Sequence, residues 1–151
     1  MRTRREARER ALSLCYELDV RGSSLDELLA DLPTEPDPYA LELARGVEEH
    51  RDEVDTLIRK FADRWSLERM PVIDRNVLRM GVYELAHRPE VPVGVAISEA
   101  VELAKRYSTD DSGRFVNGML GRIAEFVREP TADSHAPPRD RGGRRRRPGQ
   151  G

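Results

Sequence analysis

The sequence predicts an all-α fold. Apolar residues recur every three to four positions along most of the chain, and no segment alternates apolar and polar residues as a half-buried strand would. Ser, Asp, Pro and Gly also stand where such helices would begin or end. The chain has 151 residues, of which 38% are hydrophobic and 36% charged, which fits one hydrophobic core covered by helices with a solvated side.

The first two helices are predicted over residues 4–20 and 24–32. An apolar stripe marks the first helix, and Gly22 follows it as a stop signal. Ser24 is suited to cap the second helix, with Asp26 and Glu27 in its first turn, where the helix dipole favours negative charge. The stripe of the first helix consists of Ala7, Ala11, Leu14, Cys15 and Leu18.

The rest of the chain predicts four further helical segments. Asp37 and Pro38 form a cap and a first helical position that open a long segment over residues 38–61, with a bend expected at 50–52. Residues 65–71 predict a connector between two subdomains, because Ser66 and Pro71 interrupt the pattern. Helices are then predicted over residues 72–87, 93–107 and 110–128.

The two ends of the chain are basic and its middle is acidic. Residues 1–10 hold five Arg and two Glu, residues 130–151 hold six Arg and two Asp, and the net charge of −2 therefore leaves −9 for the middle. Residues 1–129 predict one helical domain, whereas the Arg-, Pro- and Gly-rich residues 130–151 predict a disordered tail. The tail would either attract phosphate weakly or only increase solubility.

The composition predicts a cytoplasmic protein. No apolar run approaches the roughly 18 residues that a membrane-spanning helix needs, and no secretory signal is visible. Cys15 is the single cysteine, so an internal disulfide framework is excluded. Because Cys15 lies in the apolar stripe, we expect a buried, unreactive thiol.

Three arginines of the first helix are the strongest candidates for binding an anionic partner. Helical rotation places Arg4, Arg5 and Arg8 in one arc beside the apolar stripe, with Tyr16 near the same arc. Guanidinium groups can grip phosphate, and a neighbouring aromatic ring can stack on an unpaired base, so this pattern suits single-stranded RNA. Alternatively, Glu6 and Glu9 neutralise the arginines and the surface binds nothing.

No residue pattern indicates catalysis, a metal or a cofactor. The chain has no P-loop, dinucleotide glycine motif or nucleophile elbow. His50, His87 and His135 are scattered and lack metal-ligand spacing, so no metal centre is expected. Asp110 and Asp111 are explained by their place at a helix start.

Three passages resemble the NusB family of transcription antitermination proteins. The Arg-rich first helix precedes them in the order typical of that family, so the resemblance covers residues 4–128 and excludes the tail. The passages are residues 70–85 (MPVIDRNVLRMGVYEL), residues 91–105 (VPVGVAISEAVELAK) and residues 115–120 (FVNGML) after Asp110-Asp111-Ser112.

The resemblance implies a NusB-like bundle of about seven helices in two packed subdomains, and a function in binding rather than catalysis. It implies a partner, the small-subunit ribosomal protein NusE, with which boxA-type RNA is bound within the RNA polymerase antitermination complex, supporting ribosomal RNA transcription. Its implied partner-binding residues are Asp74 and Tyr16. Its implied RNA-binding residues are Arg4, Arg5, Arg8, Tyr16, Asp111 and Phe115, with Arg2 as a possible addition.

The residues leave other interpretations open. A helical interaction or homodimerisation module would keep the first helix away from RNA. Tyr16, Trp65 and Phe115 would also serve as core residues, and for Phe115 the stripe shared with Met119 favours the core. Some RNA cytosine methyltransferases carry a similar helical region, but this chain ends before any catalytic domain. Glu6, where related sequences often have another Arg, should weaken phosphate binding without NusE.

Overall fold

The computed structural model describes residues 3–63 and 65–128, and within these ranges every regular element is helical, with no strand. The all-α prediction is therefore confirmed. The tail predicted over residues 130–151 lies outside the described residues. The elements are α1 (Arg4–Arg21), α2 (Leu25–Ala30), α3 (Pro38–Glu49), α4 (Arg51–Phe61), the 3₁₀ turn η1 (Leu67–Arg69), α5 (Val72–His87), α6 (Val93–Tyr107) and α7 (Asp110–Val127).

Local capping sets the helix ends that the sequence predicts. Thr3 and Glu6 form a reciprocal capping box at the start of α1, and Gly22 ends that helix with a left-handed φ of 71°. Ser24 and Glu27 form a second capping box at α2. Asp37 caps α3 by accepting hydrogen bonds from the backbone of its first turn, with Pro38 at the first helical position.

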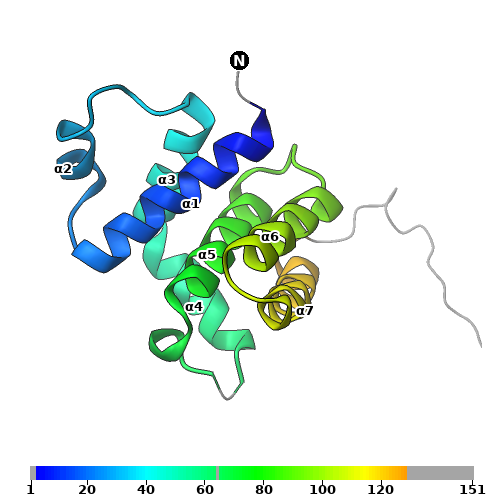
Figure 1. Cartoon of the computed structure of the whole chain (residues 1–151). Helices are drawn as coiled ribbons and strands as arrows, with labels where there is room; N and C mark the ends of the chain where they lie inside the picture. The colour runs from blue at the N-terminus through cyan, green and yellow to red at the C-terminus, as the bar shows by residue number, and fades with distance from the viewer. Residues whose placement is uncertain (1–2, 64, 129–151) are drawn as a thin grey trace, which may run out of the picture.

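The bend expected at residues 50–52 is a break between two helices. His50 ends α3 and precedes α4, with a φ of −107° and ψ of 23°. The chain therefore turns at His50, and α4 leaves in a new direction (Figure 1). This corner brings the start of α4 towards the end of α5, where Glu53 contacts His87.

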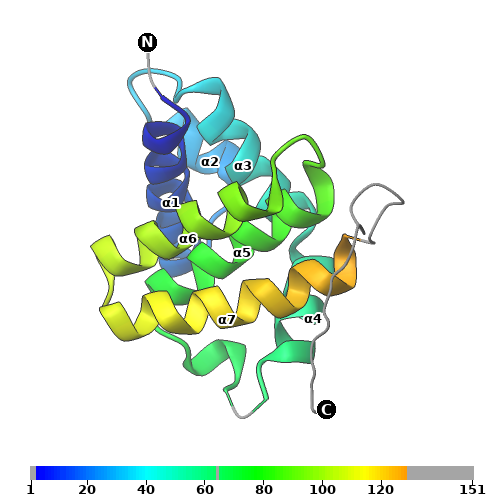
Figure 2. The same cartoon turned by 90° about the vertical axis from the view of Figure 1, so that its right-hand side faces the viewer.

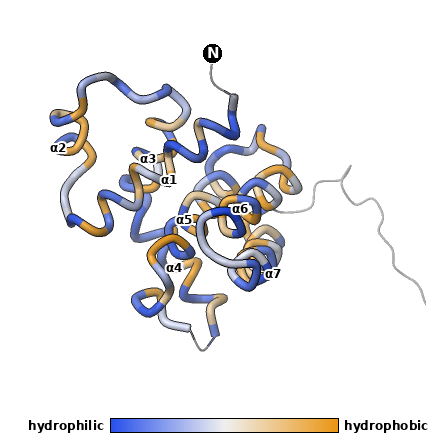
Figure 3. Tube along the Cα trace, in the orientation of Figure 1, coloured by the Kyte–Doolittle hydropathy of each residue, from blue (hydrophilic) through white to orange (hydrophobic). Residues whose placement is uncertain are grey.

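Helix α5 is the centre of the bundle and contacts α1, α3, α4, α6 and α7. Helices α6 and α7 run antiparallel to each other and cover one side of α5 (Figure 2). Each helix contains both apolar and polar stretches, as expected when one side packs inward and the other faces solvent (Figure 3). The fully buried side chains come from both halves of the chain, including Leu14, Leu43, Leu78 and Leu120, so α5 joins the two groups of helices through one core.

A largely buried ionic network joins α1 and α4 to α5. Asp19 accepts hydrogen bonds from Arg75 at 2.7 and 3.0 Å and from Asn76 at 2.9 Å. Arg79 links the Asp19 carboxylate, at 3.1 Å, to that of Asp55, at 2.9 and 3.1 Å. Because each charge has an opposite partner, the network fixes the register of three helices.

None of the helices described here combines the length and apolar character that crossing a membrane requires. The longest ones, α1 and α7, each have a polar side.

Candidate nucleic-acid interface

Arg4 and Arg5 lie at the exposed start of α1. The Arg4 guanidinium lies over the Tyr39 ring, 3.7 Å from its centre, in a cation–π arrangement. Arg5 donates to Glu99 of α6 at 2.7 and 3.1 Å, yet 56% of its side chain remains exposed. The hydrogen bond from Arg5 lowers the pKa of Glu99. Both arginines remain accessible, although Glu99 partly offsets the charge of Arg5.

Arg8 does not share this exposed surface, and the expectation of three outward arginines is wrong at this position. Its side chain is buried, and it donates to both oxygens of the equally buried Glu84, at 2.9 to 3.2 Å. Burial acts to lower the pKa of Arg8, but the hydrogen bond and charge of Glu84 outweigh burial and raise it. Arg8 therefore joins α1 to α5, and its guanidinium is not displayed to a ligand.

Tyr39 completes this buried cluster by donating a short hydrogen bond from its hydroxyl to Glu84. Burial, together with the hydrogen bond to Glu84, raises the pKa of Tyr39 to about 12. The face of the same ring supports Arg4. Arg8 thus contributes to the surface indirectly, because it holds Glu84 and through it the ring under Arg4.

Tyr16 lies on the same stripe of α1 as Arg5, eleven residues or about three helical turns further along. Its side chain is 41% exposed, so the core interpretation is wrong for Tyr16. Between the two residues, Glu9 pairs with Arg106 of α6. Glu9 is thus directed to α6 instead of along α1, and Glu6 takes part in the capping box with Thr3.

A second group of predicted residues lines a groove of about 440 Å³ between the α4–α5 connection and the start of α7. The centroids of the Trp65 and Phe115 rings, which both line the groove, are 6.0 Å apart, with Trp65 53% exposed and Phe115 half-buried against the core. The exposure of Trp65 contradicts its core interpretation, whereas Phe115 has both a core side and a groove side. The groove is lined by Trp65, Met70, Pro71, Asp74, Thr109, Asp111, Ser112 and Phe115.

Asp74 has one carboxylate oxygen that no described residue contacts with a hydrogen-bond donor. Oδ2 accepts a hydrogen bond of 2.7 Å from the Ser112 hydroxyl, while Oδ1 is buried and meets no donor among the described residues. An unsatisfied buried acceptor is costly, so such atoms are rare unless a ligand, water or partner supplies the donor. Asp111, in contrast, is exposed on the first turn of α7 and pairs with Arg114.

Residues that pattern reasoning missed hold these two surfaces in place. Glu84, Glu99 and Tyr39 position the arginines, and Ser112 orients Asp74. All act through contacts between residues 35 to 94 positions apart in the sequence, so no local sequence pattern indicates them.

The profile of the NusB family matches residues 5–125, most of the described chain. The chain belongs to the NusB family. The transcription antitermination protein NusB of Salinispora tropica is 50% identical over 134 residues, covering 84% of this chain and 98% of that protein. The same-named protein of Myxococcus xanthus is 44% identical over 140 residues, covering 86% of this chain and all 100% of that protein.

Solved structures of NusB proteins share the fold. NusB of T. maritima superposes with a TM-score of 0.73 at 40% identity, covering 83% of this chain and 93% of that one. A chain from a complex of the antitermination factors NusB and NusE with double-stranded RNA gives a TM-score of 0.70 at 30% identity, covering 82% and 96%. Membership confirms the NusB-like fold and identifies a transcription antitermination factor that is not an enzyme.

One expectation about this NusB-family chain is overturned by its tertiary structure. His50 and His87 are not scattered, because the break between α3 and α4 brings His50 against the end of α5. Their rings stack with centroids 4.0 Å apart, and both contact Glu53. His135 lies outside the described residues.

Proposed function

We propose that this NusB protein binds boxA-type single-stranded RNA jointly with NusE, as part of the RNA polymerase antitermination complex that supports ribosomal RNA transcription. The observation that carries the proposal is the presence of two kinds of exposed side chain that suit RNA, guanidinium groups and aromatic rings. Accessible guanidinium groups begin α1, and exposed aromatic rings lie further along α1 and at the groove beside α7. The solved complex of a related NusB with NusE and double-stranded RNA supports NusE and RNA as partners, and the single-stranded form is proposed here from the exposed aromatic rings.

The RNA would be held by charge and selected by stacking. Arg4 and Arg5 would contact phosphates, which supplies affinity that depends on salt but not on sequence. Tyr16 and Phe115, with Asp111 beside Phe115, would meet unstacked bases, which is how proteins usually read single-stranded RNA. Arg8 would act only by holding Glu84 and Tyr39 beneath Arg4.

NusE would be bound by Asp74 and Tyr16. The unpaired Oδ1 of Asp74 lines a groove with apolar walls, a combination that suits a protein segment offering a backbone or side-chain N–H. The acidic charge of the chain between its basic ends opposes RNA binding, so a partner that adds basic or neutral surface would strengthen it. We therefore expect weak RNA binding by this chain alone and tight binding with NusE.

Fluorescence anisotropy of a labelled boxA-type strand tests this proposal. The titration uses the full chain with NusE at several salt concentrations, and compares the double variant Arg4→Gln, Arg5→Gln with the control Arg21→Gln. Arg21 is an exposed arginine at the other end of the same helix. We expect the double variant to bind at least about tenfold more weakly and its log–log salt slope to be shallower by roughly 1.4, since two phosphate contacts are lost.

The proposal would be wrong if the double variant and the control bound equally, or if no binding occurred at low salt. A duplex of the same sequence should compete poorly, because its bases are stacked and inaccessible to Tyr16 and Phe115. Light scattering on the same samples tests the alternative of a homodimerisation module. A dimer whose mass did not change when RNA and NusE were added would favour that alternative over RNA binding.

A further inference from the structure

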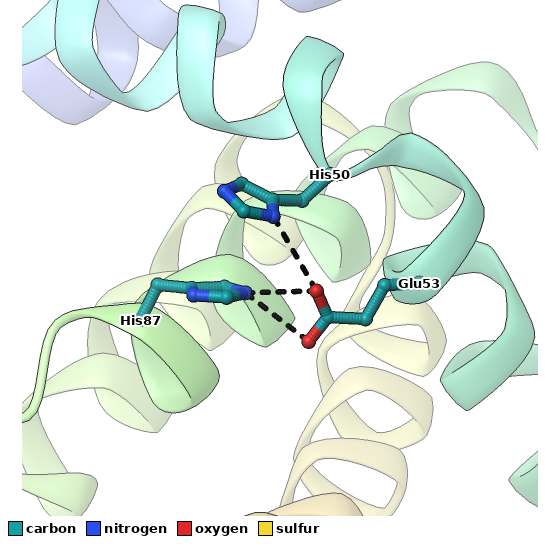
Figure 4. A group of neighbouring side chains, drawn as sticks. All are labelled: His50, Glu53 and His87. Atoms are coloured by element: carbon teal, nitrogen blue, oxygen red, sulfur yellow. Dashed lines mark hydrogen bonds and ion pairs between the residues drawn. The ribbon is translucent and has the colours of Figure 1, made fainter.

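Three potential metal ligands converge at the corner between α3, α4 and α5. Nδ1 of His50 lies 3.4 Å from Oε1 of Glu53, and Nε2 of His87 lies 3.0 and 3.1 Å from the two oxygens of the same carboxylate. Both rings direct a nitrogen at Glu53 (Figure 4). We propose that His50, Glu53 and His87 form a binding site for Zn²⁺ or a similar divalent first-row transition metal ion.

The spacing of the three ligand atoms suits tetrahedral coordination. Zinc binds His nitrogen and carboxylate oxygen at about 2.0–2.2 Å, so neighbouring ligands in a tetrahedron stand roughly 3.3 Å apart. The separations of 3.0 and 3.4 Å from Glu53 are close to this value, and all three ligand atoms lie within 4.8 Å of one another. A small movement of the side chains would place them around one ion, with water as the fourth ligand.

Rigid helix ends hold the ligands near these positions. His50 is the junction residue between α3 and α4, Glu53 lies in the first turn of α4, and His87 is the last residue of α5. The buried Tyr83 ring stacks on His87 at 5.4 Å and faces His50 at 5.9 Å. The imidazoles are therefore oriented before an ion binds, which lowers the entropic cost of binding.

The ligand set selects the class of ion. Two imidazoles and one carboxylate suit zinc, cobalt or nickel, whereas magnesium and calcium prefer oxygen ligands. The three side chains are partly exposed, so an ion can enter and leave. Binding would fasten the α3–α4 corner to the end of α5. None of the three residues belongs to the proposed RNA or NusE surface, so the inference does not depend on the proposed function.

Isothermal titration of the chelator-treated full chain with ZnCl₂ tests the proposal. We expect one ion per chain, a visible Co²⁺ spectrum typical of tetrahedral ligation, and no binding of Mg²⁺. With zinc at a hundredfold excess over its Kd, the unfolding midpoint should rise by about 5–10 °C. The double variant His50→Gln, His87→Gln should lose the site, and Glu53→Gln should weaken it at least about tenfold, because a carboxylate ligand is lost.

The control is His135→Gln, which removes the third histidine, outside the described residues, and should bind zinc as the wild type does. Cys15 is buried and should not compete as a ligand. Circular dichroism in EDTA would establish that each variant is folded. If the double variant does not fold, the affinity of Glu53→Gln for zinc still tests the site. The proposal would be overturned by absence of a 1:1 zinc complex, by its retention in the folded double variant His50→Gln, His87→Gln, by an unchanged Kd in Glu53→Gln, or by its loss in His135→Gln.

Discussion

Replacing Arg8 by Met should destabilise the protein strongly, because it leaves the Glu84 carboxylate buried without its cationic partner. Three hydrogen bonds from Arg8 to Glu84 are lost, and among the described residues the Glu84 carboxylate keeps only the bond from Tyr39. Breaking a buried ion pair by removing one partner costs about 3–5 kcal/mol. The remaining Tyr39 bond offsets part of this cost, so we expect the free energy of unfolding to fall by roughly 3 kcal/mol and the midpoint by about 10 °C.

Urea and thermal unfolding followed by circular dichroism would measure these changes, with a double-mutant cycle as the control. Met at position 8 combined with Glu84→Gln removes both charges and keeps an acceptor for the Tyr39 hydroxyl. The double variant should therefore be more stable than the sum of the single effects by at least about 1 kcal/mol. Additive effects, or a single-variant cost below about 1 kcal/mol, would refute a buried, coupled pair.

Below its unfolding transition, Arg8→Met should lose less than about threefold in RNA affinity; a much larger loss would show that Arg8 itself contacts RNA.

Three further predictions concern single positions. Burial acts to raise the pKa of Asp19, but hydrogen bonds from Arg75 and Asn76 outweigh burial and lower the pKa. Asp19→Asn should therefore lower the free energy of unfolding by about 2 kcal/mol at pH 7. The difference in urea midpoint between wild type and variant should shrink below about pH 4, where the Asp of the unfolded chain becomes protonated. An equal difference at pH 7 and pH 3 would contradict this. Burial raises the pKa of Cys15 to about 12, so a disulfide reagent should modify its thiol at pH 8 only after unfolding, and rapid modification of the folded protein would disprove burial. A Cβ on Gly46 would lie 2.2 Å from the Tyr83 ring, so Gly46→Ala should lower the free energy of unfolding by roughly 1–3 kcal/mol, and an unchanged urea midpoint would show that the ring moves without cost.

The helices were predictable because their ends are set by neighbouring residues. Gly22 ends α1 in a left-handed conformation, and Asp37 with Pro38 starts α3, as the local pattern indicates. The break near residues 50–52 was also predictable, and the structure places it at His50. These signals act within a few residues and need no knowledge of tertiary packing.

The site was less predictable because the environment of each side chain depends on distant helices. Arg8 borders the apolar stripe of α1, and only the position of Glu84, 76 residues away, makes it buried instead of exposed. The approach of His87 to His50 likewise requires the packing of α5 against the α3–α4 corner. Resemblance correctly identified the family, but burial had to come from the structure.

Photo-crosslinking of the complex of this chain, NusE and a boxA-type RNA, followed by mass spectrometry of the joined peptides, tests the central claim most directly. Peptides of α1 that contain Tyr16, and peptides around Phe115, should carry the crosslinked nucleotides, because these aromatic rings are proposed to meet the bases. Crosslinks confined to α2, α3 or residues 129–151 would contradict an RNA surface built from α1 and the groove beside α7.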